Sequence, residues 1–552
     1  MKIKFPPMIQ KYLQTYPWKK MKMSVLRIGG VLILALLGFF FFNRSIPKNE
    51  MPPLTKTNDP YPTQAITIQT PFNDSFIIKE PIFPDRICSI ADFGAIGDGK
   101  TMNTDVFRNA IASCAQAGGG KVIVPTGIYL TGPIKLESNI ELHVERDATI
   151  LFSPYPKDYL PVVFSRFEGI EYYNYSPPIY ANGATNVAIT GTGTLNGQGS
   201  IRWWKIMAKA NKFINGLYAM GDDNIPVSDR VFGDEIKGLR PAFIECVNCH
   251  HVLIENIKIV NGPMWTIHPL YSDHIIIRGV DIATAPGPST DGIAIDSSTF
   301  VLVENSTFNT GDDAIVLKSG RDKDGWRVHR PTENVVIRDC TIKEAHGAIA
   351  IGSEMSGDIR NVFGSDITIN NAQFGFRIKA ALGRGGVVEN IWMQDFSIRS
   401  ISIDTIQMTT DYGYPFRENN TAPPLFQNIH LTNFTGLKNS QAIFIEGLPD
   451  FPIENITFQN ITLPTTKDGI VIRDARGIRM DNLKITAKKD YPFIKLTDSK
   501  DISIRNTPCP NNVSICLAVR GERSENIDIQ GNNYEQDRIQ TSVEVHQDAM
   551  LK

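Results

Sequence analysis

HVLIENIKI, residues 251–259, alternates apolar and polar positions, and variants of this pattern recur along the rest of the chain. Other copies read HIIIRGVDI (274–282), FVLVENSTF (300–308) and NVVIRDCTI (334–342). The copies start 22 to 38 residues apart, a spacing typical of a solenoid whose coils carry loops of different length. Their first aliphatic residues are Val252, Ile275, Val301, Val335, Val362, Ile391, Ile429, Ile456, Ile478, Ile502 and Ile527.

The repeat predicts an all-β protein, and specifically a right-handed parallel β-helix. Each copy is short and rich in β-branched residues, and the spacing leaves no room for crossover helices, so successive coils should stack about 4.8 Å apart. A β-sandwich or a propeller would show hairpin turns instead of one repeated corner. One helix is expected at 104–117, with Thr104 as its N-cap and Gly118 as its stop, closing the open end of the solenoid.

The N-terminal sequence predicts a segment that targets the chain to a membrane. Residues 1–27 carry seven Lys or Arg residues, and an uncharged apolar run follows. We expect a cytoplasmic basic N-terminus at 1–27 and a transmembrane or signal-anchor helix at 28–43, with the rest of the chain in the periplasm or outside the cell. A cleaved signal and a secreted protein are the alternative. The expected order then continues with a linker at 44–85, the solenoid at 86–537 and a polar C-terminal tail at 538–552.

Composition restricts the partners that the chain can bind. The net charge of -2 argues against a polyanion-binding surface over the whole protein, so no nucleic-acid partner is expected and an acidic ligand must meet a local cluster of cations. The sequence suggests no cofactor, and a monomer is expected. Of the seven cysteines, Cys509 and Cys516 are the most plausible local disulfide in an exported chain, and an odd count leaves at least one thiol free.

Three aspartates fall on neighbouring coils of the predicted solenoid. NTGDDAIVLKSG (309–320) contains Asp312 and Asp313 side by side, and Asp291 in PSTDGIAID lies 21 residues before Asp312, which is about one coil. Hydrolysis of a glycosidic bond needs one protonated carboxyl for the leaving oxygen and one ionised carboxylate to activate water, and mutual repulsion raises one of the pKa values. A lone Asp would more plausibly cap a polar corner. Three at coil spacing favour a catalytic cluster.

The next two coils add a histidine and two cations. His346 follows Asp312 by 34 residues, one coil plus an inserted loop, and should therefore stack beside the aspartates. Arg377 and Lys379 are two positions apart, so their side chains leave a strand on the same face. They could belong to a structural ion-pair network, or they could bind the carboxylate of an acidic sugar polymer.

The motifs STDG, GDD, HG and RIK, in this order on consecutive coils, resemble those of glycoside hydrolase family 28, the polygalacturonases of pectin breakdown. SIADFGAIGDGKTMNTDVFRNAI and GPMWTIHP also resemble family landmarks, so the resemblance runs from about residue 86 to about residue 530. It implies hydrolysis of α-1,4-galacturonosidic bonds by single displacement with inversion. Asp312 would be the general acid, Asp291 and Asp313 would activate water, and His346 would tune the acid.

The resemblance also assigns substrate contacts. Arg377 and Lys379 would bind a galacturonate carboxylate. Tyr412 resembles the family's substrate-contacting tyrosine, with Tyr414 as its rival, and His268 is expected in the cleft beside Trp265. The chain departs from the family pattern at four positions. The family has Asn, an acid, Pro and Gly where this chain has Ser289, Ala294, Ile295 and Ala345, respectively. These departures concern the register of the substrate more than the activity.

The inserted loop SGRDKDGWRVHRPTEN most resembles bacterial members that trim galacturonic acid from chain ends. It is expected to wall off one end of the cleft and to supply Arg321, Arg327 and His329, although a solvated surface loop is the alternative. Other functions stay open: a rhamnogalacturonan hydrolase, a pectate-lyase-type β-elimination that would use the acids to bind calcium, and a sugar-binding solenoid without turnover. Arg377 and Lys379 favour galacturonate over rhamnogalacturonan, and we expect no metal at the site.

Overall fold

The computed structural model describes residues 61–72, 75–234, 237–413 and 420–551. The predicted basic N-terminus, membrane segment and first part of the linker lie outside these residues. In the described ranges, no helix is both long and apolar enough to cross a membrane.

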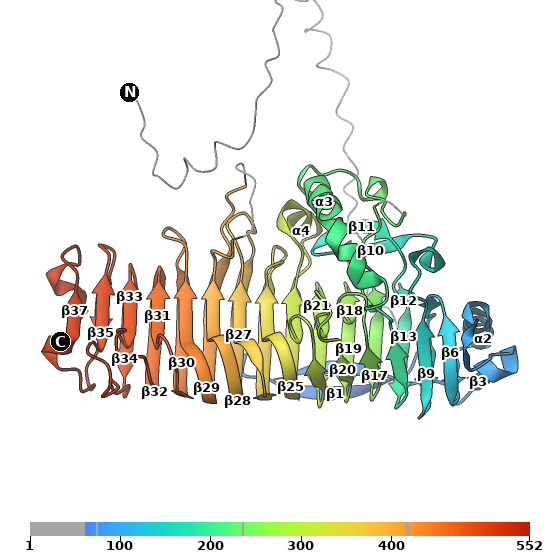
Figure 1. Ribbon diagram of the computed structural model, residues 1–552, viewed down its shortest axis with the longest axis horizontal. Helices are drawn as coiled ribbons and strands as arrows, with labels where there is room; N and C mark the ends of the chain where they lie inside the picture. Colours follow the sequence, from blue (N-terminus) through green and yellow to red (C-terminus); the bar gives the residue numbers. More distant parts are fainter. Residues whose placement is uncertain (1–60, 73–74, 235–236, 414–419, 552) are drawn as a thin grey trace, which may run out of the picture. The chain divides into compact units, whose positions relative to one another are not determined.

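Three faces of parallel strands form a β-helix (Figure 1). Face A contains β7 (Ile134–Lys135), β12 (Ile179–Asn182), β15 (Ile244–Val247), β18 (Ile267–Leu270), β21 (Ile293–Asp296), β24 (Ile315–Lys318), β27 (Ala372–Lys379), β31 (Ile470–Arg473), β33 (Ile494–Thr497), β35 (Leu517–Arg520) and β37 (Ile539–Thr541). Face B contains β3 (Ile87–Ser89), β5 (Gly120–Val124), β8 (Ile140–Val144), β13 (Thr185–Gly191), β16 (His250–Glu255), β19 (Asp273–Arg278), β22 (Thr299–Glu304), β34 (Lys500–Arg505), β36 (Glu525–Asp528) and β38 (Met550–Leu551).

Face C contains β4 (Asp98–Met102), β6 (Gly127–Thr131), β9 (Ala148–Phe152), β14 (Thr194–Asn196), β17 (Lys258–Val260), β20 (Asp281–Ala283) and β23 (Thr307–Asn309). Longer strands in the middle coils bend around the corners between faces: β25 (Thr332–Gly352), β26 (Ile359–Ile369), β28 (Val387–Thr409), β29 (Leu425–Glu446), β30 (Ile453–Leu463) and β32 (Ala475–Ile485). Parallel strands joined by such connections wind in the right-handed sense.

The stacking register follows the sequence repeat. Val252 pairs with Ile275, Ile275 pairs with Val301, and the ladder continues through all eleven positions of the repeat to Ile527. These side chains are buried inside the coils, because alternate residues of a strand point to opposite faces. The predicted parallel β-helix is therefore confirmed.

The predicted helix is α2 (Thr104–Gln116), which packs its apolar side on the first coils. Its N-cap is Asn103 rather than Thr104, because the Thr104 hydroxyl accepts a hydrogen bond from the Gly132 amide at 2.7 Å instead. Cys114 on this helix forms a disulfide with Cys88, a pairing that the sequence analysis did not identify.

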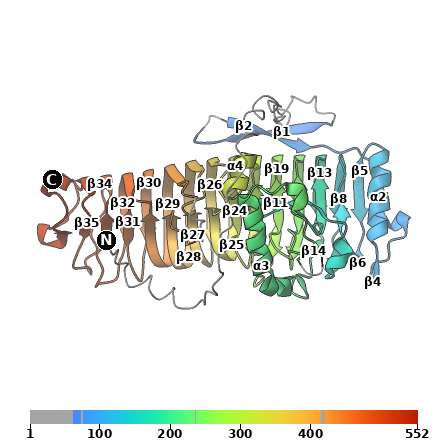
Figure 2. The same cartoon turned by 90° about the horizontal axis from the view of Figure 1, so that it is seen from above.

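The solenoid domain extends beyond both predicted boundaries. Residues 63–81 of the expected linker form a hairpin, in which β1 (Thr63–Gln69) pairs with β2 (Ser75–Pro81), because their alternating apolar residues bury one side. The hairpin runs along face B, where Ile68 and Ile78 pack on outward-facing apolar side chains of five coils (Figure 2). The expected polar tail contributes β37 and β38, which pair with β35 and β36 as the last coil.

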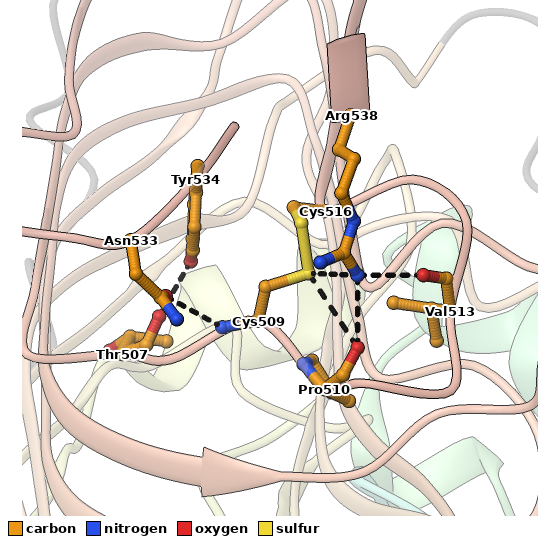
Figure 3. The surroundings of a disulfide bond; sticks show 8 residues. All are labelled: Thr507, Cys509, Pro510, Val513, Cys516, Asn533, Tyr534 and Arg538. Atoms are coloured by element: carbon orange, nitrogen blue, oxygen red, sulfur yellow. Dashed lines mark hydrogen bonds between the residues drawn. A yellow bond between two sulfur atoms is a disulfide. The ribbon is translucent and has the colours of Figure 1, made fainter. Parts of the chain in front are cut away.

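The predicted disulfide between Cys509 and Cys516 is present (Figure 3). The guanidinium of Arg538 donates hydrogen bonds to the Val513 carbonyl at 2.7 Å and to the Pro510 carbonyl at 3.0 Å, which fixes the loop that the disulfide closes. Three further cysteines are buried free thiols: Cys246, Cys249 and Cys340.

An additional group of elements lies above the face A strands of the middle coils (Figure 1). It consists of the hairpin of β10 (Val163–Phe167) and β11 (Ile170–Asn174), the helix α3 (Trp203–Asp222) and the helix α4 (Asp322–Val328). These elements contact one another and interrupt the repeat at three separate places in the chain. They border the candidate site.

Candidate active site

The three aspartates lie together at the corner that leads into face A. Asp291 precedes β21 and Asp313 precedes β24, and the Gly292 amide donates to the Asp313 carbonyl at 2.9 Å. One carboxylate oxygen from each of Asp291, Asp312 and Asp313 lies within 4.8 Å of the others. The coil spacing read from the sequence therefore brings these acids into one cluster.

His346 occupies the next coil on the same corner. Its backbone amide donates to the Asp312 carbonyl at 3.0 Å, so the histidine stacks directly on the acid as the spacing predicts. The following residue, Gly347, faces the cluster, and a Cβ at this position would lie 2.4 Å from Oδ1 of Asp313. The HG pair thus needs its glycine for the close approach of a carboxylate.

Lys379 and Arg377, both on β27, reach the cluster and the histidine respectively. Nζ of Lys379 lies 2.9 Å from Oδ2 of Asp313. Arg377 donates from Nη1 to Nε2 of His346 at 3.1 Å and from Nε to Oε1 of Gln407 at 2.6 Å. The centre of the Tyr412 ring lies 5.0 Å from the Arg377 guanidinium carbon and 5.4 Å from the Lys379 nitrogen, so these two cations and the tyrosine meet.

These contacts fix the tautomer of His346. A guanidinium can only donate, so Nε2 of His346 must be the acceptor of the Arg377 bond. Nδ1, which lies 3.0 Å from Oε1 of Gln373, then carries the proton. His346 thus links Gln373 to Arg377.

Burial and neighbouring charge separate the aspartates electrostatically. Burial and the adjacent Asp313 carboxylate raise the pKa of Asp312, although Lys379 opposes the shift. Burial also acts to raise the pKa of Asp313, but the charge and hydrogen bond of Lys379, together with His346 and Lys318, outweigh it, and the net shift is downward. Burial and the charge on Asp312 raise the pKa of Asp291 well above its ordinary value. The cluster therefore holds Asp313 ionised and favours a proton on the other two acids.

Two adjoining cavities meet at Asp312. Lining residues common to both cavities are Asp312, Lys379 and Tyr412. The inner cavity is also lined by Glu168, Trp265, Ser289, Asp291, Asp313, Lys318, Ser353 and Glu354. The outer cavity is also lined by Ala285, Pro286, Asn309, Thr310, Gly311, Glu344, Ala345, His346 and Gln373. Asp312 is thus placed to reach a bond between two sugar units, one in each cavity.

Two of the predicted substrate contacts lie elsewhere. His268 is buried, with Nδ1 3.0 Å from Oε1 of Glu245 and Nε2 3.5 Å from Oδ2 of Asp296, and it supports Trp265 edge-on rather than lining a cavity. The His268 side chain is directed into the interior because Glu245 of the preceding coil stacks on it. Arg321 is also buried, with its guanidinium over the Tyr218 ring, and it lines neither cavity.

The inserted loop also differs from its predicted role. It forms α4, and Arg327 pairs with Glu171 of β11 and with Asp324, so this arginine is directed at the β10–β11 hairpin. His329 is an exposed residue at the end of α4. The loop therefore supports the hairpin and does not supply these side chains to a cavity.

Three charged residues of the inner cavity were not identified from the sequence. Lys318 and Glu354 form an ion pair, with 2.7 Å between Nζ and Oε2, and Glu168 comes from the turn of the β10–β11 hairpin. Lys318 is the last residue of β24 and pairs with Asp296 of β21. Charged residues at the ends of neighbouring face A strands could therefore have indicated this part of the site from the sequence. Glu168 has no such signal, because its hairpin lies outside the repeat.

Comparisons with known proteins agree with this geometry. The model of glycosyl hydrolases family 28 matches residues 233–474. A probable polygalacturonase of Vitis vinifera is 34% identical over 389 residues, which cover 68% of this chain and 74% of the relative. An exo-poly-α-D-galacturonosidase of Dickeya chrysanthemi is 24% identical over 402 residues, which cover 68% of this chain and 63% of the relative.

Among solved structures, a hyperthermoactive exopolygalacturonase from Thermotoga maritima is 37% identical. It superposes with a TM-score of 0.66 over 76% of this chain and 92% of the other. Identity of this degree over most of a relative's length is a property of the whole domain and not of isolated motifs. The chain therefore belongs to glycosyl hydrolase family 28.

Proposed function

We propose that this protein hydrolyses α-1,4-galacturonosidic bonds of polygalacturonate and removes galacturonate from the chain end. Asp312 donates a proton to the leaving oxygen. Asp313 accepts a proton from the attacking water, and Asp291 helps to position this water. Lys379 keeps Asp313 ionised, and Tyr412 contacts the leaving part of the chain. Arg377 is buried and lines neither cavity, so it acts through His346, which lines the outer cavity.

The observation that carries this proposal is the position of Asp312 between two cavities, beside a carboxylate of opposite pKa shift. A carboxyl group whose pKa is raised keeps its proton for the leaving group, whereas one whose pKa is lowered stays available as a base. Two neighbouring acids of the same type thus have different roles because only Asp313 is paired with Lys379.

The division of residues between the cavities supports a position for each sugar. Asp291 and Asp313, which would activate water, line only the inner cavity, so the sugar whose C1 is attacked must lie there. The outer cavity then takes the leaving chain. The names of the Dickeya chrysanthemi and Thermotoga maritima relatives, both of which are exo-acting enzymes, support the same mode of action.

The stereochemical course is a separate part of the proposal. The family resemblance favours inversion, although inverting enzymes commonly have carboxyl groups roughly 6.5–9.5 Å apart. Here one carboxylate oxygen of each aspartate lies within 4.8 Å of the others, so we place the attacking water beside the acid cluster and not between acid and base. The anomeric configuration of the first product decides this point.

Loss of activity on removal of the acid tests the assignment. Asp312→Asn keeps the shape of the side chain but has no proton to donate, so reducing-sugar release from polygalacturonate should fall about 100- to 10,000-fold. Asp339→Asn is the matched control, because Asp339 is an exposed corner residue with φ 53°, a conformation that Asn accepts well. Equal activity of both variants would refute the role of Asp312.

One observation favours a second candidate function. The oxygen spacing of the aspartates would also suit a divalent cation, as a β-elimination of the pectate-lyase type would require. A lyase would stop in the presence of a chelator and would yield an unsaturated product that absorbs ultraviolet light. A hydrolase retains its activity with the chelator and yields no such product.

We also propose that residues 1–43 hold the enzyme at the membrane, with the solenoid in the periplasm or outside the cell. The basic residues followed by an apolar run support this, and the disulfides suit an oxidising compartment. An intact mass from the membrane fraction that includes residue 1 would support the anchor. A soluble protein lacking this segment would contradict it.

A further inference from the structure

The turn of the β10–β11 hairpin carries an unusual residue. Phe167 pairs with Ile170, so Glu168 and Gly169 form a two-residue turn, with φ of 43° and 85°. Turns of this kind favour Asn, Asp or Gly at the first position, because a longer side chain is disfavoured at positive φ. A glutamate at this position therefore suggests a use for its side chain.

The hairpin is fixed to the solenoid on one side. The buried guanidinium of Arg166 donates to Oδ1 of Asp296 at 2.9 Å, and Ser165 donates to Oε1 of Glu245 at 2.8 Å. Both partners lie on face A strands, β21 and β15. The turn is thus held at a defined position over face A.

The inserted loop fixes the hairpin on the other side. The Arg321 amide donates to the Gly169 carbonyl at 3.1 Å, and Asp324 accepts from the Glu171 amide at 2.9 Å. A Cβ on Gly169 would lie 2.7 Å from the Arg321 backbone nitrogen, so the turn and the loop touch directly. Glu168 is the charged residue of this assembly that lines the inner cavity, whereas Arg321 and Arg327 of the loop hold the hairpin in place.

Glu168 lines the inner cavity on the side away from the reacting acids. Burial and the charge of Glu354 raise the pKa of Glu168, whereas a hydrogen bond that its carboxylate accepts from Tyr218 and the charges of Arg321 and Lys318 oppose this shift. Asp291 interacts instead with Asp312, Lys318 and Asp313. The turn contacts Arg321, which follows β24, whereas Asp313 precedes this strand. Lys318, the last residue of β24, pairs with Glu354 and therefore lies on the side of the Glu168–Glu354 wall.

The carboxylates of Glu168 and Glu354 in this wall can bind the hydroxyl groups of a sugar. Carboxylates accept strong hydrogen bonds from hydroxyl groups, whereas they repel another uronate. The charge of Lys318, which its Glu354 partner stabilises, can meet the one carboxylate of the bound sugar. A pyranose whose C1 lies at Asp312 directs C4, the atom opposite C1, toward the far wall.

We propose that Glu168 recognises the free 4-hydroxyl of the terminal galacturonate and thereby determines that only a chain end enters the inner cavity. This inference rests on the proposed hydrolase function and names the specificity-determining residue of that site. A chain that continued beyond the terminal sugar would replace the hydroxyl with a glycosidic oxygen, which cannot donate to the carboxylate, and would bring a second uronate against it.

The test compares digalacturonate with the corresponding disaccharide whose non-reducing ring has a 4,5 double bond and no 4-hydroxyl. Loss of a hydrogen bond to a charged group should give the wild-type protein a kcat/KM ratio of roughly 10- to 150-fold in favour of the saturated substrate. In Glu168→Asn the ratio should fall to within about threefold of unity. Asn suits the turn backbone better than Glu does, so this variant should fold at least as well.

The matched control is Glu171→Gln on the same hairpin. Glu171 interacts with Arg327 and Tyr271 and lines neither cavity, so its loss disturbs the hairpin but should leave the substrate ratio as in the wild type. An unchanged ratio in Glu168→Asn, or an equal fall in both variants, would overturn the role of Glu168. A wild-type protein that cleaves both substrates equally would overturn it too. One that cleaves neither would overturn the hydrolase function itself.

Discussion

At the scale of single residues, one ammonium group distinguishes two adjacent aspartates. Asp312 and Asp313 are both largely buried, and burial raises the pKa of a carboxyl group. Lys379 contacts Asp313 and not Asp312, so the two pKa values move in opposite directions. A doublet of identical residues can therefore supply both an acid and a base.

This division predicts how the pH dependence of the reaction responds to Lys379→Met. The base must be ionised, so activity is lost as the pH falls through the pKa of Asp313, which Lys379 lowers. Without the ammonium, burial raises this pKa, and the acid limb of the kcat profile should move to higher pH. The measurement is kcat against pH at saturating substrate.

Lys343→Met is the control for that experiment, since Lys343 is an exposed lysine on β25 in the coil of His346. Its profile should match that of the wild type. An acid limb that stays in place, or that moves to lower pH, in Lys379→Met would show that Lys379 does not stabilise the anion of Asp313.

The sequence predicts the site residues that lie on the repeat and not those outside it. Asp291, His346 and Lys379 follow from coil spacing, because stacked coils bring equivalent positions together. His268 also lies on the repeat, but its direction depends on Glu245 and Asp296, whose charges hold it in the interior. Glu168 reaches the cavity from an insertion whose position no periodicity specifies.

At the scale of elements, the β1–β2 hairpin is the clearest departure from the expected linker. It covers outward-facing apolar residues on face B, and β2 contacts β13, β16, β19 and β22. The alternation of apolar residues in AITIQ and SFIIKEP was visible in the sequence. The apolar surface that the hairpin covers could not be recognised in the sequence, because each of several coils contributes only one residue to this surface.

Two neighbouring isoleucines of β2 allow a direct test of this packing. Ile78 is 0% exposed and Ile77 is 51% exposed. Ile78→Ala should weaken docking of the hairpin by about 2–5 kcal/mol, because it leaves a cavity against face B. Ile77→Ala should change it by less than about 0.5 kcal/mol. Amide hydrogen exchange of β1 and β2 measures both effects, and equal protection in the two variants would contradict this packing.

At the scale of the whole molecule, the fold and the specificity come from different parts of the chain. The solenoid is predictable because each coil contacts only its neighbours, so one local pattern specifies the entire stack. The inner cavity is not predictable in this way, because residues around 168, 320 and 354 must come together over face A. Chain-end action is thus a property of the insertions, while the acid cluster is a property of the coils.

The most direct test of chain-end hydrolysis is the time course of products from polygalacturonate, followed by proton NMR with the full-length protein. It reports the size and the anomeric configuration of each product as it forms. We expect monomeric galacturonate from the earliest points, released as the β anomer, with no unsaturated sugar. Early mixtures of longer oligomers, a first product in the α configuration, or a double bond in the product would contradict it.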